Sequence, residues 1–122
     1  MKADIKQVLE SIPDFEDFME LAAQIATLSF NKMQIENQIK TAEANTFKEA
    51  MSKPLENGKF PSSSFVSNAF LHTGLNGEIV QLRDALADTT ANLEKRKMQF
   101  SIYKEMIGIF QTVSANERSQ GF

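Results

Sequence analysis

Positions at alternating spacings of four and three, most of them apolar, run without a slip through the second half of the chain from Leu75 to Ser114. A repeat that averages 3.5 residues over this length is typical of a long helix packed along a coiled-coil seam. The positions of this second seam are Leu75, Ile79, Leu82, Leu86, Thr89, Leu93, Arg96, Phe100, Tyr103, Ile107, Phe110 and Ser114. The pattern predicts a helix over about residues 76–117, with Asn76 as its cap.

The first half of the chain carries a seam of the same spacing. Its positions are Phe18, Leu21, Ile25, Leu28, Lys32, Ile35, Ile39, Ala42 and Thr46. Ser11 and Asp14 form a capping-box-like start with Pro13 in the first turn, and Pro54 disfavours helix at the residue before it. The pattern therefore predicts a first helix over about residues 13–52.

Two long helices joined by one connection, residues 53–75, indicate an all-α fold: a long antiparallel helical hairpin resembling a coiled coil, in one domain over residues 1–122. If facing residue numbers sum to about 128, Phe18 faces Phe110 and Ile25 faces Tyr103. The same register places Lys32 opposite Arg96. Two like charges in one layer require neutralisation by a nearby glutamate or access to water.

Each helix carries apolar residues beside its seam, which one partner helix cannot cover. A short N-terminal helix, with Ile5, Val8, Leu9 and Ile12 at helical spacing, covers at most part of them. We therefore expect a homo-oligomer. Its predicted interface residues are Phe15, Met19, Ile102, Met106, Ile109 and Val113, extended on the first helix by Ala22, Ala26 and Phe30. Gly108 is expected to permit close helix approach near Phe18.

The connection is rich in aromatic residues, which are spaced five apart at Phe60, Phe65 and Phe70. The serines at 62–64 follow Pro61 and predict a short helix over about residues 64–72. In one interpretation this helix closes the end of the hairpin, with Phe65 packed inside it. In the other, the phenylalanines form a recognition surface, for which Phe60 and Phe70 are the better candidates.

Composition narrows the chemistry. The chain has no cysteine and one histidine, so disulfides and thiolate metal sites are excluded and we expect no metal site, no cofactor and no enzymatic activity. No apolar run is long enough to span a membrane and no signal peptide is evident, which predicts a cytoplasmic protein without a membrane partner. The net charge of −3 is unfavourable for a dedicated nucleic-acid-binding protein.

Lysine and arginine residues on both sides of the connection nevertheless form a possible phosphate-binding strip. The candidate nucleic-acid-binding residues are Lys48, Lys53, Lys59, Arg83, Lys95 and Lys97, together with Phe60 and Phe70 for stacking on bases. The competing interpretation is that the run Lys95 to Lys97 is an ordinary solvated helix face.

The stretch PSSSFVSNAFLHTG leads into a long helix that ends in aromatic and aliphatic residues followed by an arginine. Those residues are Phe100, Tyr103, Ile107, Phe110 and Arg118. Over residues 60–122 this arrangement resembles the short bacteriophage recombination-mediator proteins (UvsY-like). The resemblance implies an oligomeric helical protein that binds single-stranded DNA and helps to load a recombinase onto it.

Two functions therefore stand at this stage. The first is a DNA recombination or repair accessory that holds single strands on a multimer, where weak contacts add through avidity. The second is a structural or adaptor protein that self-assembles through its apolar base and binds a protein partner through its phenylalanine-rich tip.

Overall fold

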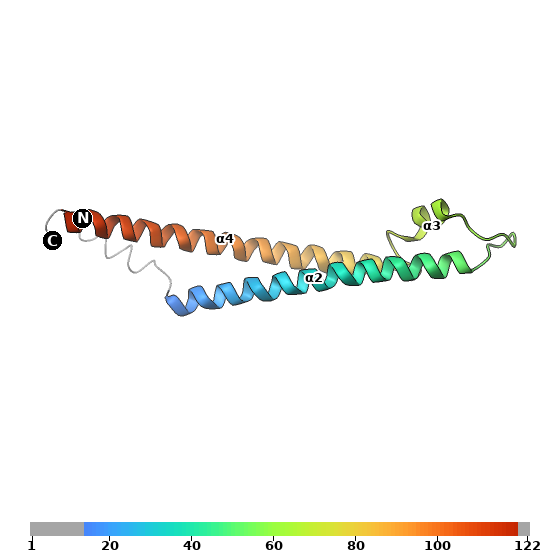
Figure 1. Ribbon diagram of the computed structural model, residues 1–122, viewed down its shortest axis with the longest axis horizontal. Coiled ribbons are helices and arrows are strands. Elements are labelled where there is room, and N and C mark those ends of the chain that lie inside the picture. Colours follow the sequence, from blue (N-terminus) through green and yellow to red (C-terminus); the bar gives the residue numbers. More distant parts are fainter. Residues whose placement is uncertain (1–13, 120–122) are drawn as a thin grey trace. The chain divides into compact units, whose positions relative to one another are not determined.

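The computed structural model describes residues 14–119, which contain three α-helices and no strand: α2 (Phe15–Ser52), α3 (Ser63–Phe70) and α4 (Glu78–Ser119) (Figure 1). The all-α prediction is confirmed for these residues. α2 begins two residues after the predicted start, and α4 begins and ends two residues after its predicted bounds. The predicted N-terminal helix, with Ile5 to Ile12, and the start signals at Ser11 and Pro13 lie outside the described residues.

Contacts divide the chain into two compact units, which are described separately. The connection unit comprises residues 28–91, and the terminal unit comprises residues 14–27 and 92–119 of the described chain. The organisation as one domain remains a prediction.

The seam positions form the less exposed face of both long helices. All of the predicted positions, nine in the first half and twelve in the second, are buried or half-buried. Apolar spacing thus identifies the inward face correctly, because side chains 3.5 residues apart on average return to the same side of a helix.

Within the connection unit, polar contacts join α2 to the beginning of α4. Arg83 Nη2 donates to Glu43 Oε1 at 2.7 Å, and Thr46 Oγ1 donates to Glu78 Oε1 at 3.5 Å. Residue numbers rise along one helix as they fall along the other, so the two segments run in opposite directions within this unit.

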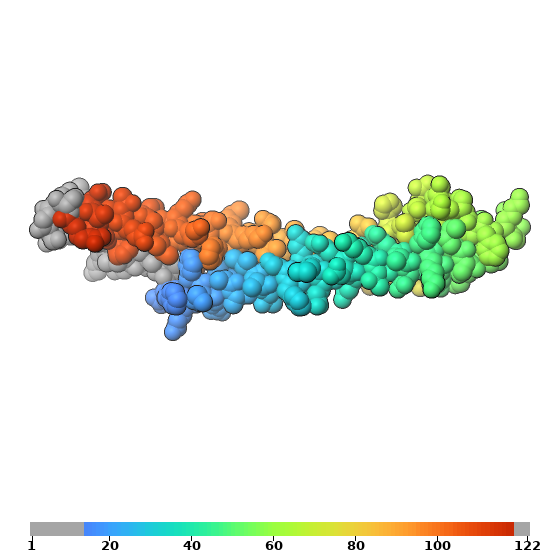
Figure 2. All heavy atoms as spheres, viewed as in Figure 1, coloured from blue at the N-terminus to red at the C-terminus, as the bar shows by residue number. Residues whose placement is uncertain are grey.

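The core of the connection unit lies where α3 meets the two longer helices. Val66 of α3 and Ile79 of α4 are fully buried, and α2 contributes Ile39, Thr46 and Ala50. Figure 2 shows α3 seated against the last turns of α2. A third helix therefore covers the apolar end of this helix pair.

The prediction that Phe65 packs into this end is wrong. Phe65 is 44% exposed, and the neighbouring Val66 occupies the core instead. Consecutive helical residues point about 100° apart, so only one of the two can face inward. α3 begins at Ser63, where the Ser62 side chain accepts a hydrogen bond from the Phe65 N–H at 3.1 Å, and packs with the face that carries Val66.

Within the terminal unit, Phe18 packs against Phe100 and Tyr103, with ring centroids 4.6 and 6.4 Å apart. Phe110 lies ten residues beyond Phe100, about 15 Å along the helix. The predicted facing of Phe18 and Phe110 is therefore wrong. Apolar seam residues recur every three or four positions, so a pairing shifted by ten residues still brings apolar residues together, and the spacing alone does not select the register.

Candidate functional site

Four of the six predicted oligomer-interface residues are exposed apolar side chains of the terminal unit. We call the exposed set the terminal apolar surface: Phe15, Met19, Met98, Ile102 and Ile109. Phe15 is 77% exposed, Met98 66% and Ile109 55%. The other two predicted residues, Met106 and Val113, are half-buried.

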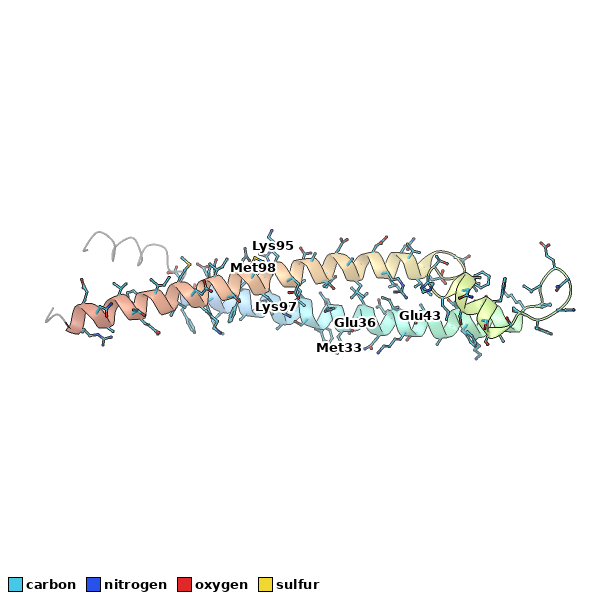
Figure 3. All side chains as sticks on the ribbon, turned by 90° about the horizontal axis from the view of Figure 1, so that it is seen from above. Met33, Glu36, Glu43, Lys95, Lys97 and Met98 are labelled. Carbon is cyan, nitrogen blue, oxygen red and sulfur yellow. The ribbon has the colours of Figure 1, made fainter. Side chains whose placement is uncertain are left out.

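Sequence reasoning missed Met98, which lies four residues before Ile102 and so continues the apolar stripe of α4. The regular spacing could have identified it. In Figure 3, Met98 and Lys95 project from the same side of α4. The stripe is therefore one helical turn longer than predicted and has a cation at its end.

Gly108 does not serve a close helix approach among the described residues. A Cβ atom placed on it meets no heavy atom within 4 Å. The helix surface is instead hollowed beside it, and the hollow is lined by Glu105, Gly108, Ile109, Thr112 and Val113. The expected packing near Phe18 is corrected to an open notch on α4.

The connection unit also carries large apolar side chains on α3 and on the loop before it that are exposed or half-buried. We call them the tip aromatic surface: Leu55, Phe60, Phe65 and Phe70. The rings of Phe65 and Phe70 meet edge to face, with centroids 6.2 Å apart. Phe60 is 66% exposed, as predicted, whereas Phe70 is half-buried. An edge-to-face pair holds both rings in a defined orientation beside solvent.

A tight turn carries the chain from α2 toward Phe60. The Gly58 N–H donates to the Leu55 carbonyl and the Leu55 N–H donates to the Lys59 carbonyl, both at 2.8 Å. Asn57 Oδ1 accepts from the Lys59 N–H at 3.0 Å, and Gly58 has φ +78°. A type I turn closed by a left-handed glycine has this bonding pattern. The turn fixes the position of Lys59 next to the exposed Phe60.

Three of the six candidate phosphate-binding cations are already paired with carboxylates. Lys53 contacts Glu49 at 3.0 Å, Arg83 contacts Glu43 at 2.7 Å and Lys97 contacts Glu94 at 3.8 Å. The remaining three, Lys48, Lys59 and Lys95, are exposed and pair with no carboxylate among the described residues.

These cations are divided between the two units, with Lys95 and Lys97 in the terminal unit and the other four in the connection unit. Paired carboxylates offset the charge that a phosphate strip needs. Fewer cations are therefore available to bind phosphates than the sequence predicted, which makes DNA binding less favourable.

Glu78 organises the start of α4. Its carboxylate accepts from the backbone N–H groups of Asn76 at 2.8 Å and Leu75 at 3.2 Å. Hydrogen bonds from its own amide and from that of Asn76 lower the pKa of Glu78 below its usual 4.5, although partial desolvation opposes the shift. The Thr73 carbonyl accepts from the N–H groups of Ile79 and Val80, so Thr73 and Glu78, rather than the predicted Asn76 side chain, bond the amides around this helix start.

No group of three or more potential metal ligands occurs among residues 14–119, and His72 is exposed in the loop after α3. In the same part of the chain, none of the helices combines the length and apolarity that crossing a membrane requires. The exposed side chains of these residues are apolar groups, aromatic rings and scattered charges, which are suited to binding.

No known protein family, curated protein or solved structure matches this chain.

Proposed function

We propose that this protein is a non-enzymatic adaptor whose antiparallel, coiled-coil-like helical hairpin forms a homo-oligomer through the terminal apolar surface and binds a protein partner through the tip aromatic surface. The observation that carries the proposal is the exposure of large apolar side chains on the terminal unit, with Phe15, Met98 and Ile109 each more than half exposed. Apolar groups of this size gathered on one unit are typical of interaction sites.

The small core of the terminal unit supports self-assembly. Among its described residues only Leu21 and Leu93 are buried apolar side chains, and the aromatic contact of Phe18 with Phe100 and Tyr103 adds to them. Small folded units bury too little surface to be stable alone, and oligomerisation is a common remedy. A second copy would bury the side chains that this unit leaves in water.

The tip aromatic surface supports partner binding. Phe65 and Phe70 form a paired aromatic surface, and Phe60 stands exposed on the preceding loop. Aromatic anchors dominate the energetics of many protein interfaces because they bury a large area at low entropic cost.

Light scattering on Ile109→Glu tests the assembly. We expect the wild type to have at least twice the mass of one chain at micromolar concentration, and Ile109→Glu to be smaller because burying a carboxylate in an apolar interface is costly. Val80→Glu is the matched control, since Val80 is an exposed apolar residue of the connection unit. A folded wild-type monomer would refute the proposal.

The second candidate is a phage-type accessory protein of DNA recombination or repair that acts in the cytoplasm, binds single-stranded DNA as a multimer and helps to load a recombinase. The specific observation in its favour is the adjacent exposed pair Lys59 and Phe60, which offers a cation for a phosphate beside a ring for a base. Lys48 and Lys95 add unpaired positive charge. Weak contacts of each subunit would add through avidity.

A gel shift with labelled single-stranded DNA at several salt concentrations separates the two functions. Phosphate contacts predict binding that weakens steeply with salt and is reduced in a Lys59→Gln, Phe60→Ala double variant. Phe65→Ala serves as the control outside the pair. Absence of binding at low salt excludes the DNA-binding function and leaves the adaptor.

A further inference from the structure

Four apolar residues on one side of α4 are spaced symmetrically, whereas the half-buried Met106 lies about 20° outside their arc and is not part of this set. Met98, Ile102, Ile109 and Val113 are separated by four, seven and four residues, so the order reads the same from either end. At 100° per residue these positions fall within an arc of about 60° on the helix surface. We call them the α4 stripe; three are exposed and Val113 is half-buried.

We infer that the α4 stripe binds the same stripe of a second copy, with the two α4 helices antiparallel about a two-fold axis between Glu105 and Met106. The inference rests on the proposed self-assembly and specifies its geometry. A two-fold interface requires that residue i contact residue j and that j contact i. In this register Ile102 faces the partner's Ile109, and Met98 faces the partner's Val113.

Charges at the two ends of the stripe favour this antiparallel arrangement. Lys95 lies three residues before Met98, and Glu117 lies four residues after Val113. The two-fold axis brings Lys95 near the partner's Glu117 at both ends of the interface. A parallel arrangement in register would bring Lys95 to the partner's Lys95, and like charges oppose association.

The surface beside Gly108 leaves room near one end of the stripe, although Gly108 itself lies about 80° outside the arc of the α4 stripe. The hollow beside it is bounded by Thr112 and Val113, which lie opposite the partner's Met98 in this register. Methionine is flexible and fills irregular apolar gaps.

One group works against the dimer. Glu105 borders the α4 stripe and lies next to the two-fold axis, where it approaches the partner's Glu105. Two carboxylates at close range repel each other. The register therefore makes a prediction opposite to the usual effect of an interface mutation: Glu105→Gln should tighten association several-fold, whereas Asp88→Asn, the same change outside the stripe, should leave it unchanged.

Single cysteines test the geometry directly, because the chain has no native cysteine. Ile102→Cys mixed with Ile109→Cys should give a disulfide-linked dimer on a non-reducing gel, whereas neither variant alone should. Residues 102 and 109 of facing chains come within bridging distance, but two copies of residue 102 are about 10 Å apart along the axis, which is too far for a disulfide. Cross-linking of Ile102→Cys with itself would show a parallel arrangement and overturn the inference.

Charge reversal gives an independent result if either cysteine variant fails to associate. Lys95→Glu should weaken dimerisation by placing two carboxylates together, and the added change Glu117→Lys should restore it. No restoration in the double variant would overturn the register.

The outcomes separate this geometry from the proposed function. An oligomer without the mixed cross-link and without charge rescue refutes the register while self-assembly stands. A monomer refutes both. A monomer in which Ile109→Cys also resists a thiol reagent shows that another segment of the same chain, such as residues 1–13, covers the stripe.

Discussion

At the scale of single residues, Glu78 and Gly74 depend on each other. The Glu78 carboxylate accepts hydrogen bonds from backbone N–H groups of the loop before α4 and from the Thr46 hydroxyl of α2. It can do so because Gly74, at φ +82°, has no side chain: a Cβ there would lie 2.5 Å from the carboxylate. One acidic residue and one glycine together fix how the connection enters α4.

Gly74→Ala should therefore destabilise the protein more than Gly58→Ala. Both positions have positive φ, which costs an alanine on the order of 1–2 kcal/mol. Only at Gly74 must the added Cβ also displace the Glu78 carboxylate, because nothing lies within 4 Å at Gly58. Chemical denaturation of both variants measures the difference, and equal losses would show that Glu78 moves aside freely.

The pKa of Glu78 predicts a pH dependence. Because the folded-state pKa is below the usual 4.5, the charged carboxylate stabilises the fold. This contribution is complete above about pH 4.5 and is lost as the pH falls through the lowered folded value. Glu78→Gln lacks it, since a neutral amide accepts weaker hydrogen bonds.

The gap in free energy of unfolding between wild type and Glu78→Gln should accordingly be largest near neutral pH and close on acidification. Urea titrations at several pH values measure it. A gap that widens toward low pH would mean that the pKa is raised rather than lowered.

At the scale of elements, α3 has an apolar inner face and an aromatic outer face. Val66 is fully buried, while Phe65 is partly exposed and pairs with Phe70. The helix therefore closes the core of the connection unit with its small residue and leaves its large rings beside solvent, where a partner can reach them.

Alanine substitutions on α3 should separate stability from binding. Val66→Ala should cost on the order of 2 kcal/mol, because it removes methyl groups from a packed core. Phe65→Ala should cost clearly less and should weaken binding to a protein partner. Thermal melts give the ranking, and a larger loss for Phe65→Ala would place that ring in the core after all.

The helices and their inward faces were predictable because both follow from periodicity along one segment. Every seam position from Phe18 to Ser114 is at least half-buried. The register was not predictable: Phe100, Tyr103 and Phe110 are all aromatic seam residues, and the 4,3 spacing does not say which of them packs against Phe18. The choice between Phe65 and Val66 was not predictable either, since it depends on which face of the short helix packs against the two longer ones.

At the scale of the whole molecule, the sequence predicted which apolar residues are exposed better than it predicted which cations are available to bind phosphate. The predicted interface residues Phe15, Met19, Ile102 and Ile109 are exposed, as an unpartnered stripe requires. The cation strip was overestimated because spacing does not show that Lys53, Arg83 and Lys97 each contact a glutamate. Those contacts arise from side-chain positions one turn away or on a facing helix.

Self-assembly through the terminal apolar surface is the central claim, and the mass of the protein in solution tests it most directly. One chain has a mass of 13.7 kDa. Multi-angle light scattering over a micromolar concentration series should give at least twice this mass for the wild type and for Val80→Glu, and a value that falls toward one chain for Ile109→Glu. A folded wild-type protein that keeps the mass of one chain across the series would contradict the account.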